Sequence, residues 1–301
     1  MTRDISSTYQ GKGAQISIVL HIPTQYSSSP FPFFCANSTM SKDLSNVKAL
    51  TFDVFGTVVD WRSSVTDELT SRASAKAISE TLSPAEKDKL AAVDWPTFAQ
   101  EWRNSYKNFV HSYVPGQTAW KDIDAHHHDS LVELLHENRL EGVWSEDEIR
   151  DLSLVWHRLR PWPDSAAGLQ RLGSKFVTAT LSNGNRTLLD DLDSFGGLGF
   201  RKILSGEDWK AYKPNPVVYD GAVEALLGKG GEKGDVAMVA AHLGDLYAAR
   251  GRGMRTVYVE RAREEDWEVG SQKYEDAKGW VDVWVKVDEG GFEEVARRLG
   301  V

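Results

Sequence analysis

The pattern of apolar and polar positions predicts a sheet interrupted by a long helical segment. Residues 47–52, Val-Lys-Ala-Leu-Thr-Phe, form a short apolar and β-branched run that is typical of a buried parallel strand. Similar runs return after residue 164, and stretches of helical periodicity such as Thr187–Leu192 and Pro216–Leu227 separate them. The further strands we predict are Phe176–Leu181, Lys202–Leu204, Val236–Ala241, Met254–Val259 and Val281–Val287. This alternation predicts an α/β fold, a doubly wound parallel sheet with helices on both faces.

The segment from residue 62 to residue 163 shows helical periodicity and contains no convincing strand. Apolar residues recur at helix spacing in two places: Phe98, Trp102, Tyr106, Phe109 and Val110, and then Leu131, Leu134 and Leu135. Ser145 and Glu148 form a capping box ahead of a third helix, and Asp164 is placed to cap a helix that runs to Leu172. We therefore predict an all-helical domain of residues 62–163, inserted into an α/β core domain of residues 46–61 and 164–301.

The first 45 residues are rich in Ser, Thr and Pro and carry few acids, and we predict a disordered tail. An organellar targeting segment is the alternative, but two early basic residues, Arg3 and Lys12, make a poor one. The apolar run Ile16–Ile22 is far shorter than the roughly 20 residues that span a bilayer, so we expect no membrane segment. Met40 lies shortly before the first strand, which leaves open whether residues 1–39 belong to the mature protein.

Composition narrows the class of partners. The formal net charge of -9, with no evident Lys/Arg-rich face, disfavours nucleic acid and anionic membrane. The single cysteine, Cys35, excludes an internal disulfide and suits a reducing compartment, so we expect a cytoplasmic protein. A hydrophobic content of 41% over 301 residues is enough for a sizeable core.

Polar residues follow four of the predicted strands. In an open parallel sheet, ligands bind beyond the carboxyl ends of the strands, so these residues are the first candidates for a site. Two carboxylates, an ammonium group and a hydroxyl from separate strand ends suit covalent attack by a carboxylate. The residues are Asp53 with Thr57, Ser182 with Asn183, Lys213, and Asp245.

In this order the residues resemble the four-part signature of the haloacid dehalogenase superfamily. That signature is Asp53-x-x-Gly-Thr57, then Ser182-Asn183, then Lys213 followed by Pro, then Asp245 eight residues before Gly253. The resemblance covers residues 47–290. It implies a Rossmann-like core with the helical insert as cap domain, and Asp53 as the nucleophile.

Two positions distinguish the phosphatases of that superfamily from its carbon–halogen hydrolases. Its phosphatases carry a general acid two residues after the nucleophile, where this chain has Phe55, and a metal-binding acid five residues before the last Asp, where it has Ala240. Mg²⁺ needs such hard oxygen ligands to offset its dehydration, whereas a halide leaves without protonation. The resemblance therefore favours a carbon–halogen hydrolase without metal or other cofactor.

Longer stretches look like type II 2-haloacid dehalogenases: Asp53–Arg62, Trp102-Arg103, Leu181–Gly184 and Tyr212–Tyr219. This likeness implies a small carboxylate substrate that Asp53 attacks at C2, giving an ester and then a 2-hydroxy acid, and it leads us to expect a homodimer. The implied substrate-binding residues are Arg103, which takes the carboxylate or the halide, Ser182 and Asn183, Phe55, and Tyr219 in support. Among the catalytic residues, Lys213 orients and neutralises Asp53, Thr57 hydrogen-bonds it, and Asp245 positions Lys213 or the hydrolytic water.

The chain departs from that pattern at Ala240 and His242, where other members have Ser and Asn. Those side chains help to place water and lysine, so the hydrolysis of the ester is the step at risk. His242 is a candidate catalytic base, although a single structural hydrogen bond is the commoner role of a histidine at a strand end.

Other conspicuous residues predict surface or packing roles. His126, His127 and His128 are consecutive, and because neighbours on a helix diverge by about 100° we expect a solvated helix face and no metal site. We expect the run Arg261–Glu265 to be solvated as well. Most of the eleven tryptophans are expected to pack in the core and the cap.

Three functions remain open on the sequence: a 2-haloacid dehalogenase, a hydrolase of phosphate esters or other electrophiles, and a catalytically weak protein that binds a small carboxylate. Phe55 and Ala240 disfavour the phosphatase. The intact set of Asp53, Lys213 and Asp245 disfavours the weak binder.

Overall fold

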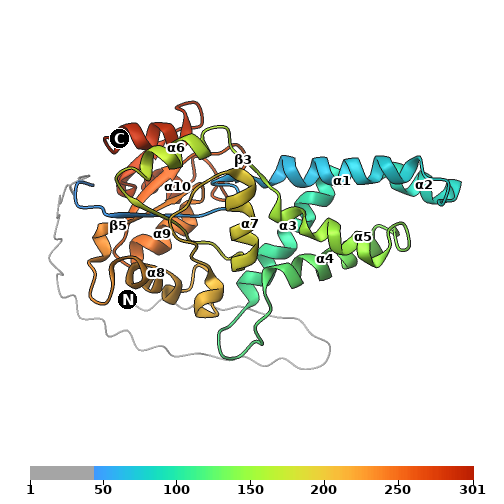
Figure 1. Cartoon of the computed structure of the whole chain (residues 1–301), viewed down its shortest axis with the longest axis horizontal. Helices are drawn as coiled ribbons and strands as arrows, with labels where there is room; N and C mark the ends of the chain where they lie inside the picture. The colour runs from blue at the N-terminus through green and yellow to red at the C-terminus, as the bar shows by residue number, and fades with distance from the viewer. Residues whose placement is uncertain (1–43) are drawn as a thin grey trace, which may run out of the picture. The chain divides into compact units, whose positions relative to one another are not determined.

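The structure is a computed structural model that describes residues 44–301 (Figure 1). The predictions made for residues 1–43, including the disordered tail, Cys35 and Met40, lie outside the described residues. Within residues 44–301, none of the helices combines the length and the apolar character that crossing a bilayer requires.

A parallel five-stranded sheet forms the centre of the fold, in the order β4-β1-β5-β6-β7. Strand β1 lies between β4 and β5, and all four of its residues are buried. The bounds are β1 Ala49–Phe52, β4 Val177–Thr180, β5 Val236–Ala240, β6 Arg255–Val259 and β7 Val283–Val285. The predicted parallel sheet is confirmed, together with five of its six predicted strands.

Successive residues of a strand point to opposite faces of the sheet, so buried strands present apolar side chains on both faces. Helices cover each of these faces. Leu50 and Phe52 share one hydrophobic cluster with the helices α6 (Ser165–Leu172), α7 (Arg186–Gly196) and α11 (Gly291–Arg298). Ala49 and Met238 share a second cluster with α8 (Pro216–Leu227), α9 (Leu243–Gly251) and α10 (Gln272–Trp280). The doubly wound architecture is therefore confirmed, and α8 has the bounds that the sequence predicts.

The predicted strand Lys202–Leu204 is wrong. This segment runs beside β4 but makes only isolated bridges, between Ala179 and Lys202 and between Ser182 and Ser205. The reason is the side chain of Thr180, whose Oγ1 accepts a hydrogen bond from Leu204 N (2.9 Å) and donates one to Leu204 O (3.0 Å). This hydroxyl takes the place of a backbone partner, so a regular ladder does not form. The short 3-10 helix η2 (Gly206–Trp209) directly follows this segment, and η3 (Lys233–Asp235) directly precedes β5.

The helical segment lies between two short antiparallel strands, β2 (Val59–Asp60) and β3 (Arg160–Pro161). Its elements are α1 (Trp61–Ala77), α2 (Pro84–Ala91), α3 (Trp95–Ser112), α4 (Ile123–Glu137), α5 (Glu146–Ser153) and the 3-10 helix η1 (Leu154–His157). Figure 1 shows α1 to α5 as a group apart from the helices that cover the sheet. The capping box of Ser145 and Glu148 is present at the start of α5. The division into a core domain and a cap domain stays a prediction.

The helical segment has an aromatic core that includes two of the three consecutive histidines. His126 and His127 are buried, so the predicted solvated face is wrong for both, and only His128 is partly exposed. His127 belongs to the buried stripe of α4 because it precedes Leu131 by four residues. It stacks on Trp156 with ring centroids 4.4 Å apart. The predicted packing role of the tryptophans is confirmed for Trp95, Trp102, Trp144 and Trp156, all of which are buried.

Asp164 stands at the N-cap position of α6, but its side chain does not cap that helix. The carboxylate instead accepts hydrogen bonds from Arg261 (2.6 and 2.8 Å) and from the backbone N of Phe292 (2.7 Å). The Arg261 side chain is only 8% exposed, and that of Glu264 only 5%. The prediction of a solvated run Arg261–Glu265 is therefore wrong for Arg261 and Glu264, which find partners inside the fold, whereas Ala262 and Arg263 are exposed.

Candidate active site

The site lies at the carboxyl edge of the sheet, where Asp53 directly follows β1. The backbone N of Asp53 donates to Val239 O (3.0 Å), which continues the pairing of β1 with β5 past the end of the strand. The turn after it passes through Gly56, whose φ of +82° favours glycine. The Asp53 side chain is 12% exposed, so it sits at the bottom of the site with little contact to solvent.

Three side chains hydrogen-bond the Asp53 carboxylate. Lys213 Nζ donates to Oδ1 (2.9 Å), while Thr57 Oγ1 (2.7 Å) and His242 Nδ1 (3.0 Å) both contact Oδ2. Burial alone would raise the pKa of Asp53, but the charge of Lys213 and the hydrogen bonds from His242 and Thr57 lower it below its ordinary value. Asp53 is therefore an ionised, oriented carboxylate.

Lys213 is the centre of the charged network, since it also donates to Asp245. Burial alone would lower the pKa of Lys213, but the charges of Asp245 and Asp53 raise it above its ordinary value. Tyr219 Oη donates to the other oxygen of Asp245 (2.7 Å), which fixes that carboxylate against the ammonium group. The structure thus brings together Asp53, Lys213, Asp245 and Tyr219 from four separate segments, as the sequence predicts.

Asn183 holds the backbone that carries Lys213. The backbone N of Lys213 donates to Asn183 Oδ1 (2.6 Å), and Asn183 Nδ2 donates to Lys213 O (3.3 Å). Ser182 is fully buried, and its Oγ accepts a hydrogen bond from Gly184 N (3.2 Å). Both residues stand at the site edge as expected, with contacts that shape the loop; their predicted contacts to substrate stay predictions.

Arg103 reaches the site from helix α3, and within residues 44–301 it forms no ion pair with a carboxylate. Arg103 is only 5% exposed, and its guanidinium lies 4.5 Å from the ring of Tyr106 and 5.4 Å from the ring of Phe55. Among residues 44–301, neither Nε nor Nη1 has a hydrogen-bond partner. A buried guanidinium with unused donors is costly, and an anion that supplied two oxygens would satisfy it. The arrangement therefore suits an anionic ligand over the aromatic floor of Phe55 and Tyr106.

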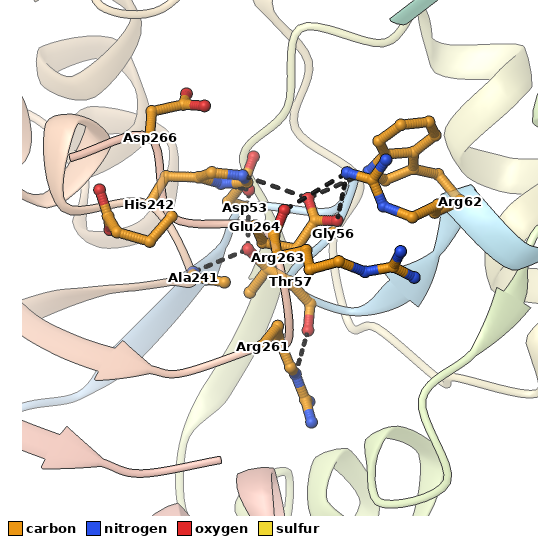
Figure 2. A network of polar contacts seen from close by, with 12 residues as sticks. Asp53, Gly56, Thr57, Arg62, Ala241, His242, Arg261, Arg263, Glu264 and Asp266 are labelled. Carbon is orange, nitrogen blue, oxygen red and sulfur yellow. Dashed lines mark hydrogen bonds and ion pairs between the residues drawn. The ribbon is translucent and has the colours of Figure 1, made fainter. Parts of the chain in front are cut away.

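His242 has a second partner, Glu264, which comes from the loop after β6. His242 Nε2 lies 3.5 Å from Glu264 Oε2 (Figure 2). Trp61 Nε1 donates to the same oxygen (3.0 Å). Burial alone would lower the pKa of His242, but its hydrogen bonds to Asp53 and Glu264 raise it to about 10. His242 is therefore an imidazolium between two carboxylates, and it lowers the pKa of Glu264 against the effect of burial.

Comparisons with known proteins show the family of this chain. The sequence profile of the haloacid dehalogenase-like hydrolases matches residues 47–252. The chain belongs to this family. It is therefore a hydrolase, and the predicted superfamily is confirmed.

Several 2-haloacid dehalogenases resemble this member of the family. The (S)-2-haloacid dehalogenase 4A of Burkholderia cepacia is 27% identical over 222 residues, which cover 72% of this chain and 85% of that protein. A crystal structure of a defluorinating L-2-haloacid dehalogenase is 29% identical, with a TM-score of 0.69, and covers 85% of this chain and 96% of that one. A second L-2-haloacid dehalogenase structure is 30% identical, with a TM-score of 0.67, and covers 84% of this chain and 100% of that one.

A magnesium ion does not fit this haloacid dehalogenase-like site. Two carboxylates of the site, Asp53 and Asp245, share the ammonium group of Lys213. Phe55 and Ala240 supply no oxygen ligand from their side chains, although a hard divalent cation needs several. In the described part of the chain, no group of three or more His, Cys, Asp and Glu side chains is arranged to hold a metal.

Sequence reasoning missed Glu264, Trp61 and Tyr106 as members of the site. Tyr106 reads as one residue of a helix stripe, and Glu264 as part of an exposed charge run. The sequence holds no local signal that singles out Glu264; the glycine of Asp53-x-x-Gly-Thr indicates only that another group approaches there, and the structure shows which one. A Cβ at Gly56 would lie 2.1 Å from Glu264 Oε2, so this glycine leaves room for that carboxylate to approach.

Proposed function

We propose that this hydrolase cleaves the carbon–halogen bond of a small 2-haloalkanoic acid through a covalent ester on Asp53. The observation that carries the proposal is the pairing of two features: an ionised, buried Asp53 held by Lys213, and a buried Arg103 with unsatisfied donors on the cap side. The first is a nucleophile and the second is a receptor for a carboxylate. The names of the similar proteins support the same substrate class.

In the first half-reaction, Arg103 binds the substrate carboxylate and Asp53 attacks C2 from the side opposite the halogen. The halide leaves with the bonding electron pair and needs no proton, so no general acid is required where Phe55 stands. Lys213 lessens the repulsion between the two anions and keeps Asp53 ionised. Attack from the back inverts the configuration at C2 and leaves a neutral ester.

In the second half-reaction, water attacks the carbonyl carbon of the Asp53 ester and releases a 2-hydroxy acid. Asp245, fixed by Tyr219, positions Lys213 or this water. Ser182 and Asn183 line the pocket beside the substrate. We propose that both half-reactions run without metal or another cofactor; a homodimer and a cytoplasmic location stay predictions.

The alternatives are a hydrolase of phosphate esters and a weak carboxylate-binding protein. The experiment is a halide-release assay with L- and D-2-chloropropionate and with fluoroacetate, run beside a panel of phosphate esters with and without Mg²⁺. Halide release from one 2-chloropropionate enantiomer, without phosphatase activity, is the expected result. Phosphate release that depends on Mg²⁺, with no halide from any substrate, contradicts the proposal.

A further inference from the structure

The imidazole of His242 contacts two carboxylates, that of the nucleophile Asp53 and that of Glu264. Nδ1 lies 3.0 Å from Asp53 Oδ2, and Nε2 lies 3.5 Å from Glu264 Oε2 (Figure 2). The imidazole is thus aligned with one ring nitrogen on each carboxylate. Its side chain is 16% exposed, so a proton on it can still reach solvent.

Glu264 is fixed firmly enough to set the state of the imidazole. Its Oε2 accepts a hydrogen bond from Trp61 Nε1 (3.0 Å), and its carboxylate lies 3.9 Å from the guanidinium of Arg62. Trp61 and Arg62 are the first two residues of α1. The absence of a side chain at Gly56 permits this approach. A carboxylate bonded to Nε2–H leaves the lone pair of a neutral imidazole on Nδ1, which is the nitrogen that faces Asp53.

The charges around His242 change when the nucleophile reacts. On the nucleophile side stand Asp53 and, behind it, the cation Lys213; on the other side stand Glu264 and the neighbouring Asp266, with Arg62 and Arg103 contributed by α1 and α3. In the resting enzyme, two carboxylates hold His242 as an imidazolium. Esterification removes the negative charge of Asp53 and leaves His242 with only one directly bonded carboxylate.

We propose that His242, oriented by Glu264, is the base that hydrolyses the Asp53 ester, and that formation of the ester switches it on. The proposal rests on the function proposed above and names the group that completes it. Alkylation of Asp53 withdraws one of the two charges that hold the proton on His242, and His242 then releases a proton to solvent. The base is therefore absent while the carboxylate is needed as a nucleophile and present once the ester must be cleaved.

The proton and charge balance closes over one turnover. Asp53 and the haloacid give the ester and halide, and His242 then loses one proton to solvent. Neutral His242 next takes a proton from water as the water oxygen bonds to the ester carbonyl carbon. The tetrahedral species expels the alkoxide of the 2-hydroxy acid, which takes the second water proton from the tetrahedral hydroxyl, and Asp53 returns as a carboxylate beside a protonated His242. The net release is one proton and one halide per turnover, as the overall hydrolysis requires.

This order of events predicts when the proton appears. In a stopped-flow experiment near pH 7 with a pH indicator, excess L-2-chloropropionate and native enzyme, a proton burst should accompany ester formation, ahead of hydrolysis. Acid-quenched samples from the same time course give the halide released and the mass of the Asp53 peptide. A halide burst without a proton burst overturns the role of His242 and leaves the proposed function intact. Absence of halide and of any Asp53 adduct instead contradicts the proposed function itself.

Variants test the hydrolysis of the Asp53 ester even if the ester does not accumulate in the native enzyme. His242→Ala should still form the ester but should slow its decay by about 100-fold or more, the range typical of a lost general base. The adduct should then appear on nearly every chain in the steady state. Ester decay at the native rate in His242→Ala overturns the proposal, whichever half-reaction limits the native enzyme.

Glu264→Gln tests the positioning role of Glu264. Without that charge, the pKa of His242 in the ester falls, so the rise of the ester-decay rate with pH should move to lower pH, with a rate at least about 10-fold slower at its plateau. Glu268→Gln is the matched control, since Glu268 is an exposed glutamate in the same loop, and it should leave profile and rate unchanged. A Glu264→Gln profile that overlays the native one shows that Glu264 only packs the loop and contradicts its positioning role.

Discussion

Lys213 Nζ lies 2.9 Å from Asp53 Oδ1, although 160 positions separate the two residues in the chain. The ammonium group contacts Asp245 as well, so one cation balances two buried carboxylates. Because it lowers the pKa of Asp53 below its ordinary value, the nucleophile is ionised at neutral pH.

The first prediction concerns the pH dependence of ester formation. In the native enzyme, the rate of the halide burst should stay level as pH falls from 7 to 5, because the pKa of Asp53 lies below its ordinary value of about 3.9. Lys213→Met leaves Asp53 buried without its cation, so its pKa should rise and the burst rate should fall by at least about 100-fold at pH 7. Rapid-quench halide measurements across this pH range give both results. An unchanged rate in Lys213→Met contradicts the role of Lys213.

Arg103→Ala should lower kcat/KM for a 2-haloacid by about 30- to 1000-fold, which corresponds to about 2 to 4 kcal/mol. The loss is large because the substrate carboxylate is left unpaired in a closed site. Lys107→Ala is the control, since Lys107 lies one turn further along α3 and pairs with Asp266 at the surface (2.6 Å). Equal kinetics for Arg103→Ala and the native enzyme show that Arg103 does not bind substrate.

Chelation should leave halide release unchanged. Lys213 holds the two carboxylates that a divalent cation would need, and Phe55 and Ala240 add no ligand. The measurement compares halide release after dialysis against EDTA with release after addition of Mg²⁺. Loss of activity in EDTA that Mg²⁺ restores contradicts the metal-free reaction.

His157 should make stability depend on pH. It bridges Asp191 (2.7 Å) and Asp124 (3.0 Å), and although burial alone would lower the pKa of His157, these hydrogen bonds raise it above 6.5. The stabilisation by protonated His157 is fully present below pH 6.5 and is lost as pH rises through the raised pKa. His157→Gln should thus cost about 1.5 to 3 kcal/mol of unfolding free energy at pH 5.5 and less at pH 9, by urea denaturation.

The control for that prediction is His136→Gln, since the His136 side chain is 76% exposed and its removal should change stability little at either pH. If His157→Gln costs the same free energy at both pH values, its contribution comes from packing alone. A cost that grows with pH contradicts the assignment of the protonated form to the folded state.

Residues that follow strands could be predicted from the sequence, and residues that fold back from loops could not. Asp53 and Asp245 follow the neighbouring strands β1 and β5, so the geometry of a parallel sheet brings them together, whereas Lys213 follows a segment that only runs beside β4. Glu264 stands in a run of charges, and only the space beside Gly56 shows why it turns inward. The contact between Gly56 and Glu264 joins residues that are far apart in the sequence, and local hydrophobic periodicity cannot predict it.

Two errors in the predicted fold have the same cause. The segment Lys202–Leu204 has strand-like residues, but the hydroxyl of Thr180 on the neighbouring strand takes the hydrogen bonds that a ladder would use. His127 reads as one of three polar neighbours, yet Trp156 provides a ring for it to stack on inside the cap. In both cases a side chain from another segment decides the outcome.

The central claim is that Asp53 becomes covalently alkylated, and mass spectrometry of acid-quenched enzyme tests it most directly. With L-2-chloropropionate, a halide burst of about one equivalent per site should coincide with an adduct on the peptide that contains Asp53. Asp53→Asn should show neither, because an amide is a poor nucleophile. Unmodified Asp53 at every time point, with no burst and no halide from any 2-haloacid, would contradict the account.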